Sequence, residues 1–313
     1  MADEEFKIDR FTIVGDLFSG QVSDVYEVVE DGTSNRFAMK LLHNEKFEER
    51  NLVQQFRQEA KLGQKLEHPN LCRVRDVVIK VGGLLPVKNP IAYFTMDMFR
   101  SLNVKAFLAS DQLGLQLRLK KALEQICSVL GYLHNEGWVH RDIKPDNLLL
   151  NKASEARLID FSLVVKKNRR TGKIQGTRTY IAPETIKKKR ATPATDIYSL
   201  GITLYEILTN EAPFKASTPT ELLKRHIGAR AIPPRELNPN VTPELERLVL
   251  RMLAKKPADR QESAEELMKI QPLHDRVLER FAASGVDQDL IKIVALSDTF
   301  AEHLGRYSEI DIA

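Results

Sequence analysis

The sequence predicts an α+β protein of two lobes, a small β-rich lobe followed by a larger, mainly helical one. With 313 residues, the chain exceeds the usual size of a single hydrophobic core. Apolar and polar residues alternate in the first part of the chain, whereas apolar residues recur at helical spacing later. We therefore expect a β-rich lobe over residues 1–98, a helical lobe over residues 99–270 and a helical extension over residues 271–313.

Alternation of apolar and polar residues predicts strands in the first lobe. The alternating segments are Phe11–Val14, Val25–Val29, Phe37–Leu42, Leu71–Val81 and Ile91–Met98. Glycines and an Asp31-Gly32 pair separate the early segments, which favours an antiparallel sheet with tight turns. One helix interrupts this sheet, because apolar residues recur at helical spacing between Leu52 and Leu66, and the pattern stops before Pro69.

Helical spacing dominates the second lobe. One helical face is formed by Leu113, Leu117, Ala122, Ile126, Val129 and Leu133. Gly137 follows this face at the position where a helix commonly ends. Two later helices are indicated by their N-terminal caps, since Thr218 and Ser263 each precede a glutamate by three residues, the capping-box spacing.

The composition is that of a folded protein without a membrane segment. Apolar residues make up 42% of the chain and charged residues 29%, so the chain is too apolar for intrinsic disorder. The N-terminus lacks a basic segment followed by an apolar one, and the apolar stretch Ile197–Thr209 is short and contains Glu206. Cys72 and Cys127 lack metal-ligand spacing and are expected to be buried, reduced thiols. We therefore expect a cytoplasmic protein.

Positive charge is concentrated in one segment of the second lobe. Ten lysines and arginines lie between Val165 and Arg190 against one acid, Glu184, although the net charge of the whole chain is only +4. Such a run is usually a solvated loop, but it can also attract acidic peptides, phosphate or nucleic acid. Tyr180 is the one aromatic residue in the run, so no nucleic-acid partner is expected.

Two polar motifs carry the chemistry of the second lobe. The first is His140-Arg141-Asp142-Ile143-Lys144-Pro145-Asp146-Asn147, and the second, Asp160-Phe161-Ser162, begins thirteen residues after Asn147. Transfer of a phosphoryl group needs metal ions that neutralise phosphate oxygens and a carboxylate that accepts the hydroxyl proton. Both residue types are present. A polar surface loop is the plain alternative, but eight ordered positions and a spaced partner motif favour the chemical interpretation.

On these motifs the sequence resembles the eukaryotic-type (Hanks-type) serine/threonine protein kinase family, over residues 11–270. The resemblance implies the two-lobed protein-kinase-like fold. It makes Asp142 the catalytic base and Lys144 the residue that steadies the transferring phosphoryl group. Asn147 and Asp160 would hold Mg²⁺.

The resemblance assigns ATP contacts to the first lobe. Phe37-Ala38-Met39-Lys40 resembles the strand whose lysine contacts the α and β phosphates, and Glu59 would be the ionic partner of Lys40. The implied adenine pocket consists of Val25, Ala38, Met96, Leu149 and the backbone from Asp97 to Phe99.

Other motifs resemble the supports of the catalytic loop in this family. Asp196 matches the acid that braces the loop, and Arg260 matches the usual partner of Glu184. Thr177 is positioned to bond both Lys144 and Asp142, which is the serine/threonine pattern rather than the tyrosine pattern.

The glycine-rich loop departs from the family's pattern. When Val25 is aligned, Phe18, Gly20 and Ser23 stand at the three glycine positions. A second register, starting at Gly15, keeps two glycines but loses the alignment of Val25. In the first register, which we prefer, the glycine closest to the phosphates is retained, while the larger residues reduce the flexibility of the loop.

Two further positions depart from the pattern. Ser162 replaces a glycine and restricts a segment that commonly switches between active and inactive forms. Gly63 stands where the family has a large apolar residue, so we expect a packing gap beside the helix of Glu59 and a weaker pairing of Glu59 with Lys40.

The resemblance implies a serine/threonine protein kinase that transfers the γ-phosphoryl group of Mg-ATP to a protein substrate. The alternative is a pseudokinase scaffold, which the departures at Phe18, Ser23, Ser162 and Gly63 favour. The presence of all the implied catalytic and metal-binding residues argues against it. A small-molecule kinase fits less well, because Thr177 and the Ala182-Pro183-Glu184 segment are typical of peptide-phosphorylating members.

Regulation is expected at Thr171. In many related kinases a phosphorylated residue nine positions before the alanine of Ala-Pro-Glu pairs with the arginine of the His-Arg-Asp motif, but here that position is Lys173. Thr171 follows Arg169 and Arg170, and its phosphate would attract Arg141 and the nearby cations. The kinase would phosphorylate this segment on a second copy of itself. A basic loop that needs no phosphate is the alternative.

The extension over residues 271–313 lies beyond the resemblance. Apolar residues at helical spacing predict two helices separated at Ser284-Gly285. These helices either pack against the second lobe or form a docking surface, including one for self-association.

Overall fold

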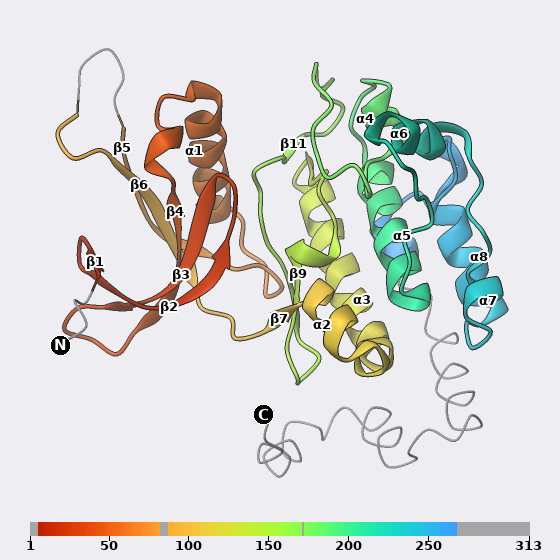
Figure 1. Ribbon diagram of the computed structural model, residues 1–313, viewed down its shortest axis with the longest axis horizontal. Helices are drawn as coiled ribbons and strands as arrows, with labels where there is room; N and C mark the ends of the chain where they lie inside the picture. The colour runs from red at the N-terminus through yellow and green to blue at the C-terminus, as the bar shows by residue number, and fades with distance from the viewer. Residues whose placement is uncertain (1–5, 82–86, 171, 268–313) are drawn as a thin grey trace, which may run out of the picture. The chain divides into compact units, whose positions relative to one another are not determined.

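The computed structural model describes residues 6–81, 87–170 and 172–267 (Figure 1). The chain separates into two compact units. The first unit contains the chain up to Arg100 together with the short segment Ile159–Ser162, and the second contains Ser101–Leu158 and the chain from Leu163 onwards. The predicted extension over residues 271–313 and the proposed switch residue Thr171 lie outside the described residues.

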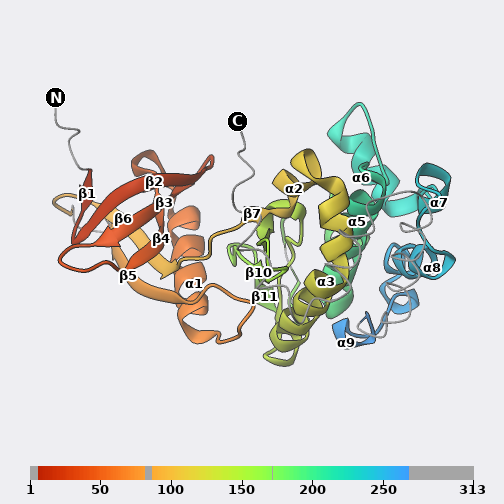
Figure 2. The same cartoon turned by 90° about the horizontal axis from the view of Figure 1, so that it is seen from below.

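The first unit is built on a six-stranded antiparallel sheet with the strand order β1-β2-β3-β4-β6-β5. The strands are β1 (Lys7–Ile8), β2 (Phe11–Ser19), β3 (Ser23–Glu30), β4 (Arg36–Leu42), β5 (Val74–Lys80) and β6 (Ile91–Asp97). They lie side by side in Figure 2, with the helix α1 (Arg50–Lys65) next to them. A short 3₁₀ helix, η1 (Asn44–Lys46), precedes α1. The five strands and the helix expected from the sequence are therefore confirmed, with β2 longer than its predicted segment.

Alternation along β4 gives the sheet two apolar faces. Met39 packs on one face in a cluster with Phe11 and Tyr93. Leu42 packs on the other face in a cluster with Phe56 of α1 and Phe94 of β6. Lys40 lies two residues before Leu42, and residues two apart in a strand point to the same face of the sheet. Its side chain therefore lies on the face that α1 covers.

The second unit is mainly helical. Its longer helices are α2 (Val104–Ser110), α3 (Gln112–Asn135), α5 (Pro193–Thr209), α6 (Pro219–Gly228) and α8 (Pro243–Met252). Short helical turns are α4 (Pro183–Ile186), α7 (Pro234–Leu237), α9 (Ala264–Leu267), η2 (Pro145–Asn147) and η3 (Pro257–Asp259). Two small antiparallel sheets complete it, one of β7 (Leu102–Asn103), β9 (Leu148–Leu150) and β10 (Ala156–Leu158), the other of β8 (Trp138–Val139) and β11 (Val165–Lys166).

The helix α5 is the centre of the second unit. Thirteen of its residues are buried, and it packs against α3, α7 and α8. Thr192 and Thr195 form a capping box at its N-terminus, and Asn210 ends it in the left-handed conformation with φ 59°. Among the described residues, no helix is both long enough and apolar enough to cross a membrane.

The helix signals predicted for the second unit are confirmed where they are described. The long helix α3 spans the predicted segment, its residues Ala122, Ile126, Val129 and Leu133 are buried, and Gly137 follows it with φ +78°. Thr218 accepts a hydrogen bond from the Glu221 backbone N–H at 3.2 Å, and Ser263 accepts one from the Glu266 backbone N–H at 3.2 Å. These hydroxyls satisfy N–H groups that have no partner within the first turn of a helix.

A buried ion pair ties α4 to the chain just before α9. The guanidinium of Arg260 donates to both carboxylate oxygens of Glu184, at 2.8 and 2.9 Å. It also donates to the carbonyls of Ala194 at 2.6 Å and Ala254 at 2.8 Å. The Arg260 and Glu184 side chains are only 0% and 3% exposed, so removing either one leaves a buried, uncompensated charge.

Replacing Arg260 by Met is therefore expected to lower the free energy of unfolding by about 3 to 5 kcal/mol. Arg225→Met is the matched control, because Arg225 forms an exposed pair with Glu221 that contributes at most about 1 kcal/mol. Urea unfolding of the two variants measures both values. A loss for Arg260→Met as small as that of the control would contradict the structural role of the buried pair.

Candidate active site

Lys40, Glu59 and Asp160 meet in the first unit. The ammonium group of Lys40 donates to both carboxylate oxygens of Glu59, at 2.7 and 2.9 Å, and lies 3.8 Å from Asp160 Oδ1. Lys40 reaches this position from β4, Glu59 from α1, and Asp160 from the segment that rejoins the first unit. The pairing of Lys40 with Glu59 that the resemblance implies is thus formed in this structure.

Burial controls the charges of this group. Burial lowers the pKa of Lys40, but the carboxylates of Asp160 and Glu59 outweigh it, so the pKa lies above the usual lysine value. Burial raises the pKa of Glu59, and the negative charge of Asp160 adds to this effect while Lys40 opposes it. Lys40 is therefore held as a cation, ready for an anionic ligand.

The backbone at Asp160 has an unusual conformation. Its φ of 68° lies in the left-handed region, which non-glycine residues rarely adopt. Its Oδ1 accepts a hydrogen bond from the Ser162 backbone N–H at 3.0 Å, which closes a local turn. The φ of Ser162 lies outside the left-handed region, so this conformation does not require the glycine that the family has at that position.

The packing gap expected at Gly63 is absent, and this expectation was wrong. Gly63 is buried in α1, and the side chain of Val74 occupies the space beside it. A Cβ atom at Gly63 would collide with the Val74 Cγ2 methyl and would lie 3.3 Å from its Cβ. Glycine is therefore the residue that lets α1 approach β5 closely, since a β-branched neighbour fills the missing volume.

Gly63→Ala is accordingly expected to destabilise the first unit by about 1 to 3 kcal/mol, because overpacking outweighs the gain in helix propensity. Displacement of α1 should also weaken the Lys40–Glu59 pair. Thermal unfolding measures the first effect and nucleotide affinity the second. The double variant Gly63→Ala/Val74→Ala provides the control, because removing the Val74 methyls makes room for the new Cβ. No recovery in the double variant would contradict the collision.

The turn between β2 and β3 contains the positions implied for the glycine-rich loop. Phe18 pairs with Val25 across these strands, and Gly15 lies inside β2 opposite Glu27. The turn thus falls at residues 20–22, as in the preferred register. A Cβ atom at Gly20 would lie 2.9 Å from the Ser23 carbonyl oxygen, so this glycine allows a tight turn.

Asp24 anchors this turn, which sequence reasoning missed. It accepts hydrogen bonds from Ser19 Oγ at 2.8 Å and from Tyr26 Oη at 3.2 Å. His43 Nε2 lies 2.9 Å from its Oδ2. Only the long-range pairing of β3 with β4 brings His43 to Asp24, so no local signal in the sequence indicates it.

The residues implied for adenine are distributed over several elements. In the first unit, Val25 pairs with Lys40, Ala38 pairs with Met96, and Ala38 is buried. The backbone N–H of Asp97 donates to the Arg73 carbonyl at 3.0 Å, so a nucleotide contact at Asp97 would fall to its carbonyl oxygen. Phe99 follows in the same unit, partly buried, whereas Leu149 lies on β9 of the second unit.

Asp142 is the centre of a hydrogen-bonded group in the second unit. Its Oδ1 accepts from the backbone N–H and from the hydroxyl of Thr177, each at 3.2 Å. Its Oδ2 lies 2.9 Å from Lys144 Nζ and accepts from Asn147 Nδ2 at 3.1 Å. Lys144 also donates to the Thr177 hydroxyl at 3.0 Å. The structure thus brings together Asp142, Lys144, Asn147 and Thr177, with Thr177 bonded to Asp142 and Lys144 as the resemblance implies.

Asp196 holds the backbone just before Asp142. Its carboxylate accepts from the backbone N–H groups of His140 at 2.8 Å and Arg141 at 2.7 Å. These bonds hold Arg141 at φ 73°, a left-handed conformation that needs such support. His134, which sequence reasoning missed, contacts the same carboxylate through Nε2 at 2.8 Å. Burial alone would raise the pKa of Asp196, but the hydrogen bond from His134 and nearby positive charge keep the pKa below its usual value.

The chemistry of the two implied metal ligands fits Mg²⁺. The amide nitrogen of Asn147 donates to Asp142, at 2.8 Å to the carbonyl and 3.1 Å to Oδ2, so the amide oxygen is the atom that could accept a cation. Asp160 supplies a partly exposed carboxylate. Oxygen ligands of these two types are those that Mg²⁺ prefers.

The comparisons with known proteins agree with this geometry. The model of the protein kinase domain family matches residues 11–271. The serine/threonine-protein kinase PknB of Mycolicibacterium smegmatis is 28% identical over 265 residues, which cover 83% of this chain and 42% of the relative. The serine/threonine-protein kinase PrkC of Bacillus subtilis is 27% identical over 297 residues, 92% of this chain and 44% of the relative.

The chain therefore belongs to the protein kinase domain family, and the two-lobed fold expected from the sequence is confirmed. It spans less than half the length of these two relatives.

Proposed function

We propose that this chain is a serine/threonine protein kinase, which transfers the γ-phosphoryl group of Mg-ATP to hydroxyl groups of a protein substrate. The observation that carries this proposal is the group around Asp142, where one carboxylate oxygen faces Thr177 and the other faces Lys144 and Asn147. A fixed carboxylate beside a fixed cation is the arrangement that proton removal and phosphoryl transfer require.

Each residue of the group has a distinct task in the proposal. Asp142 accepts the proton of the substrate hydroxyl, and Lys144 stabilises the phosphoryl oxygens. Lys40 holds the α and β phosphates, and Glu59 fixes the position of Lys40. Asn147 and Asp160 are the proposed ligands of Mg²⁺, which supplies positive charge that neutralises the phosphate oxygens.

The nucleotide itself is proposed to contact further residues. Phe18, Gly20 and Ser23 surround the turn of the glycine-rich loop, and Gly20 allows the backbone to approach phosphate. The proposed adenine contacts are Val25, Ala38, Met96, Asp97, Phe99 and Leu149.

Thr177 supports serine and threonine as the acceptor residues. It bonds both Asp142 and Lys144, which is the pattern of serine/threonine members, and both relatives described above are named serine/threonine-protein kinases. The proposal does not favour a pseudokinase, because no implied catalytic residue is missing and the Lys40–Glu59 pair is formed despite Gly63.

The proposal is tested by incubating the protein with Mg-ATP and peptides that differ only in the acceptor residue. Serine and threonine peptides should be phosphorylated and the tyrosine peptide should not, and chelation of Mg²⁺ should stop the reaction. Mass spectrometry identifies the modified residue. Phosphorylation of the tyrosine peptide alone would contradict the acceptor assignment, and transfer that survives chelation would contradict the metal requirement.

Autophosphorylation at Thr171 is part of the proposal. Arg141 is only 6% exposed, and its Nε and Nη2 have no hydrogen-bond partner among the described residues. A phosphate nearby would satisfy these N–H groups and would attract Arg169 as well. A cytoplasmic location is also proposed, because Cys72 and Cys127 are buried and form no disulfide, as is usual in proteins of reducing compartments.

A further inference from the structure

The structure joins two separate parts of the basic run. Arg170 forms an antiparallel bridge with Arg190. Beside it, the Asn168 backbone N–H donates to the Ala191 carbonyl at 2.8 Å, and the Ala191 N–H donates to the Arg169 carbonyl at 3.0 Å. These bonds bring one short basic segment next to another. We call their side chains the basic patch: Lys166, Lys167, Arg169, Arg170, Lys187, Lys188, Lys189 and Arg190.

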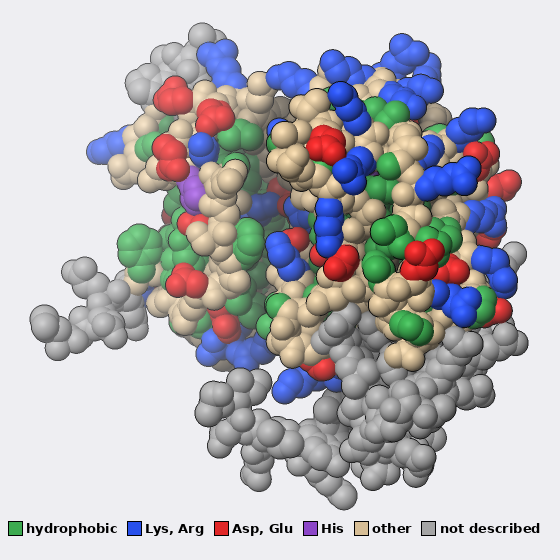
Figure 3. All heavy atoms as spheres, turned by 45° about the vertical axis from the view of Figure 1, so that its right-hand side comes forward, with side chains coloured by type: hydrophobic (Ala, Val, Ile, Leu, Met, Phe, Trp, Pro, Cys, Tyr) green, Lys and Arg blue, Asp and Glu red, His purple; other side chains and the backbone are tan. Residues whose placement is uncertain are grey.

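The charge of the basic patch is not compensated within the described chain. All eight side chains are exposed, and none forms an ion pair with a carboxylate among the described residues. Glu184, the one acid of the run, is buried and paired with Arg260, so it does not offset the patch. Lys and Arg side chains gather on the part of the second unit that carries β11 and α4 (Figure 3).

The backbone of the patch and one of its side chains are held in place. The ammonium group of Lys166 lies 3.7 Å from the centre of the Trp138 ring, a cation–π contact that fixes this side chain. Together with the backbone bonds to Ala191, this contact holds one edge of the patch against β8. A cation that is held in place loses less entropy when it binds an anionic partner than a mobile one does.

The chain leads from the patch directly to the catalytic carboxylate. A Cβ atom at Gly176 would lie 3.4 Å from the Arg141 carbonyl and 3.8 Å from Asp142 Oδ1. Thr177 bonds Asp142, and the next residue, Arg178, is an exposed cation. Lys173, also exposed, lies between Arg178 and the patch in sequence.

Asp146, the acid four residues after Asp142, could attract basic substrates but is already paired. Asp146 Oδ1 lies 3.4 Å from Lys105 Nζ, so its charge is offset on the surface of the second unit. The exposed cations nearest to Asp142 along the chain, Lys173 and Arg178, are therefore available to an anionic substrate. The charge of Arg169 also acts on Arg141, the residue before Asp142. Burial lowers the pKa of Arg141, Asp196 and Asp142 oppose this effect, and the positive charge of Arg169 adds to it.

We propose that the basic patch, with Lys173 and Arg178, selects protein substrates that carry anionic residues next to the acceptor serine or threonine. The anionic residues are Asp, Glu or a residue that is already phosphorylated. This inference rests on the proposed kinase activity and names its substrate class. It also implies that the basic segment around Thr171 is a poorer substrate for a second copy than an acidic peptide is.

An acidic polypeptide fits the patch better than other anionic partners do. Single-stranded nucleic acid binds through exposed aromatic rings, but Tyr180 is buried and the Trp138 ring is covered by Lys166. A membrane surface needs apolar residues that insert, and Ile174 is the only exposed large apolar residue described in the segment from Val165 to Arg190. Acidic side chains need only the exposed cations that are present.

The experiment compares peptides that share one acceptor serine and differ in the flanking residues, which are alanine, glutamate, lysine or phosphoserine. The wild-type protein should phosphorylate the glutamate peptide with a kcat/KM about tenfold above that of the alanine peptide, mainly through a lower KM. Each exposed charge pair contributes a small factor in affinity, and the factors of several pairs multiply. The advantage should shrink at high ionic strength, since exposed pairs are screened. The phosphoserine peptide distinguishes a preference for phosphate from one for carboxylate.

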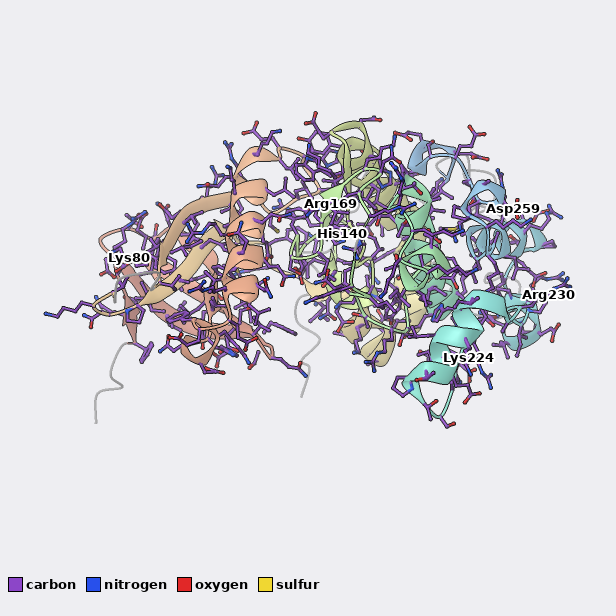
Figure 4. The ribbon with its side chains drawn as sticks, turned by 90° about the horizontal axis from the view of Figure 1, so that it is seen from above. Lys80, His140, Arg169, Lys224, Arg230 and Asp259 are labelled. Carbon is purple, nitrogen blue, oxygen red and sulfur yellow. The ribbon has the colours of Figure 1, made fainter. Side chains whose placement is uncertain are left out.

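Arg170→Gln/Lys189→Gln removes one cation from each side of the bridge and should abolish most of this advantage while leaving kcat for the alanine peptide unchanged. The matched control is Lys224→Gln/Arg230→Gln, which removes the same charge from exposed positions of the same unit. Figure 4 shows Lys224 and Arg230 away from Arg169. Fluorescence anisotropy of a labelled glutamate peptide gives a second readout that does not depend on catalysis.

The outcomes distinguish a failure of the inferred substrate class from a failure of the proposed kinase activity. Transfer to the alanine peptide without an advantage for the glutamate or phosphoserine peptide would overturn the substrate inference alone. An equal loss of preference in the control variant, or binding of single-stranded RNA or anionic vesicles in place of the glutamate peptide, would also overturn it. Absence of transfer to every peptide would overturn the proposed kinase activity and this inference with it.

Discussion

Replacing Asp142 by Asn is expected to slow phosphoryl transfer by about a hundred- to ten-thousand-fold, the usual contribution of a general base. The substitution keeps one oxygen that can accept from Thr177, while an amide nitrogen replaces the oxygen that faces Lys144 and Asn147, so thermal unfolding checks that the variant is folded. What it removes is the negative charge that takes the hydroxyl proton. The affinity for Mg-ATP should stay at the wild-type value, because none of the proposed phosphate or metal ligands changes.

Steady-state transfer rates and isothermal titration with Mg-ATP measure the two quantities on the same preparation. Asp259→Asn is the control, since Asp259 is an exposed carboxylate of the same unit with no proposed task. A transfer rate for Asp142→Asn equal to that of the control would rule out Asp142 as the base. A comparable loss of nucleotide affinity would instead assign it to binding.

Replacing Asp160 by Asn is expected to abolish transfer and also to weaken metal-dependent nucleotide binding strongly. The carboxylate is a proposed ligand of Mg²⁺, and a neutral amide cannot supply the charge that holds the ion beside the phosphates. The Asp160 carboxylate also raises the pKa of Lys40. Without this carboxylate, Glu59 should be the main anionic partner of Lys40.

The dependence of nucleotide affinity on Mg²⁺ is the decisive readout for this variant. Wild-type protein should bind ATP more tightly when Mg²⁺ is added, whereas Asp160→Asn should show little difference. Thermal unfolding without nucleotide checks that the variant is folded. An undiminished magnesium effect in folded Asp160→Asn would exclude this carboxylate as a ligand.

The sequence was sufficient for five strands and the helix α1 of the first unit and, through the resemblance, for most of the proposed catalytic residues. Period-2 alternation predicted the strands of the first unit, because each strand has two distinct faces. The resemblance carried by the motif from His140 to Asn147 implied the tasks of Asp142, Lys144 and Asn147, which lie in one short loop and contact one another in the structure. Lys40 and Glu59 followed from the resemblance and meet in the structure.

Contacts that depend on packing between distant elements were not predictable in this way. The expected gap at Gly63 is filled by Val74 of β5, a residue eleven positions later that no pattern connects to α1. His134 reaches Asp196 only because α3 and α5 pack together, and His43 reaches Asp24 only across two strands. The pairing of Arg170 with Arg190 converts what reads as one basic run into two adjoining segments.

The departures that suggested a pseudokinase are accommodated locally. Gly20 retains the tight turn of the glycine-rich loop, and Ser162 adopts a conformation that any residue can take. The residues proposed for catalysis are all present. The structure therefore gives no reason for a loss of activity. One measurement distinguishes an active enzyme from a scaffold.

That measurement is the rate of γ-phosphoryl transfer by wild-type protein whose binding of Mg-ATP has been shown on the same preparation. The proposed function predicts that protein saturated with Mg-ATP phosphorylates serine or threonine in a peptide substrate, and that Asp142→Asn binds the nucleotide equally well but transfers at least about a hundredfold more slowly. Saturation with Mg-ATP and no transfer above the level of Asp142→Asn would contradict it and would identify the chain as a nucleotide-binding scaffold.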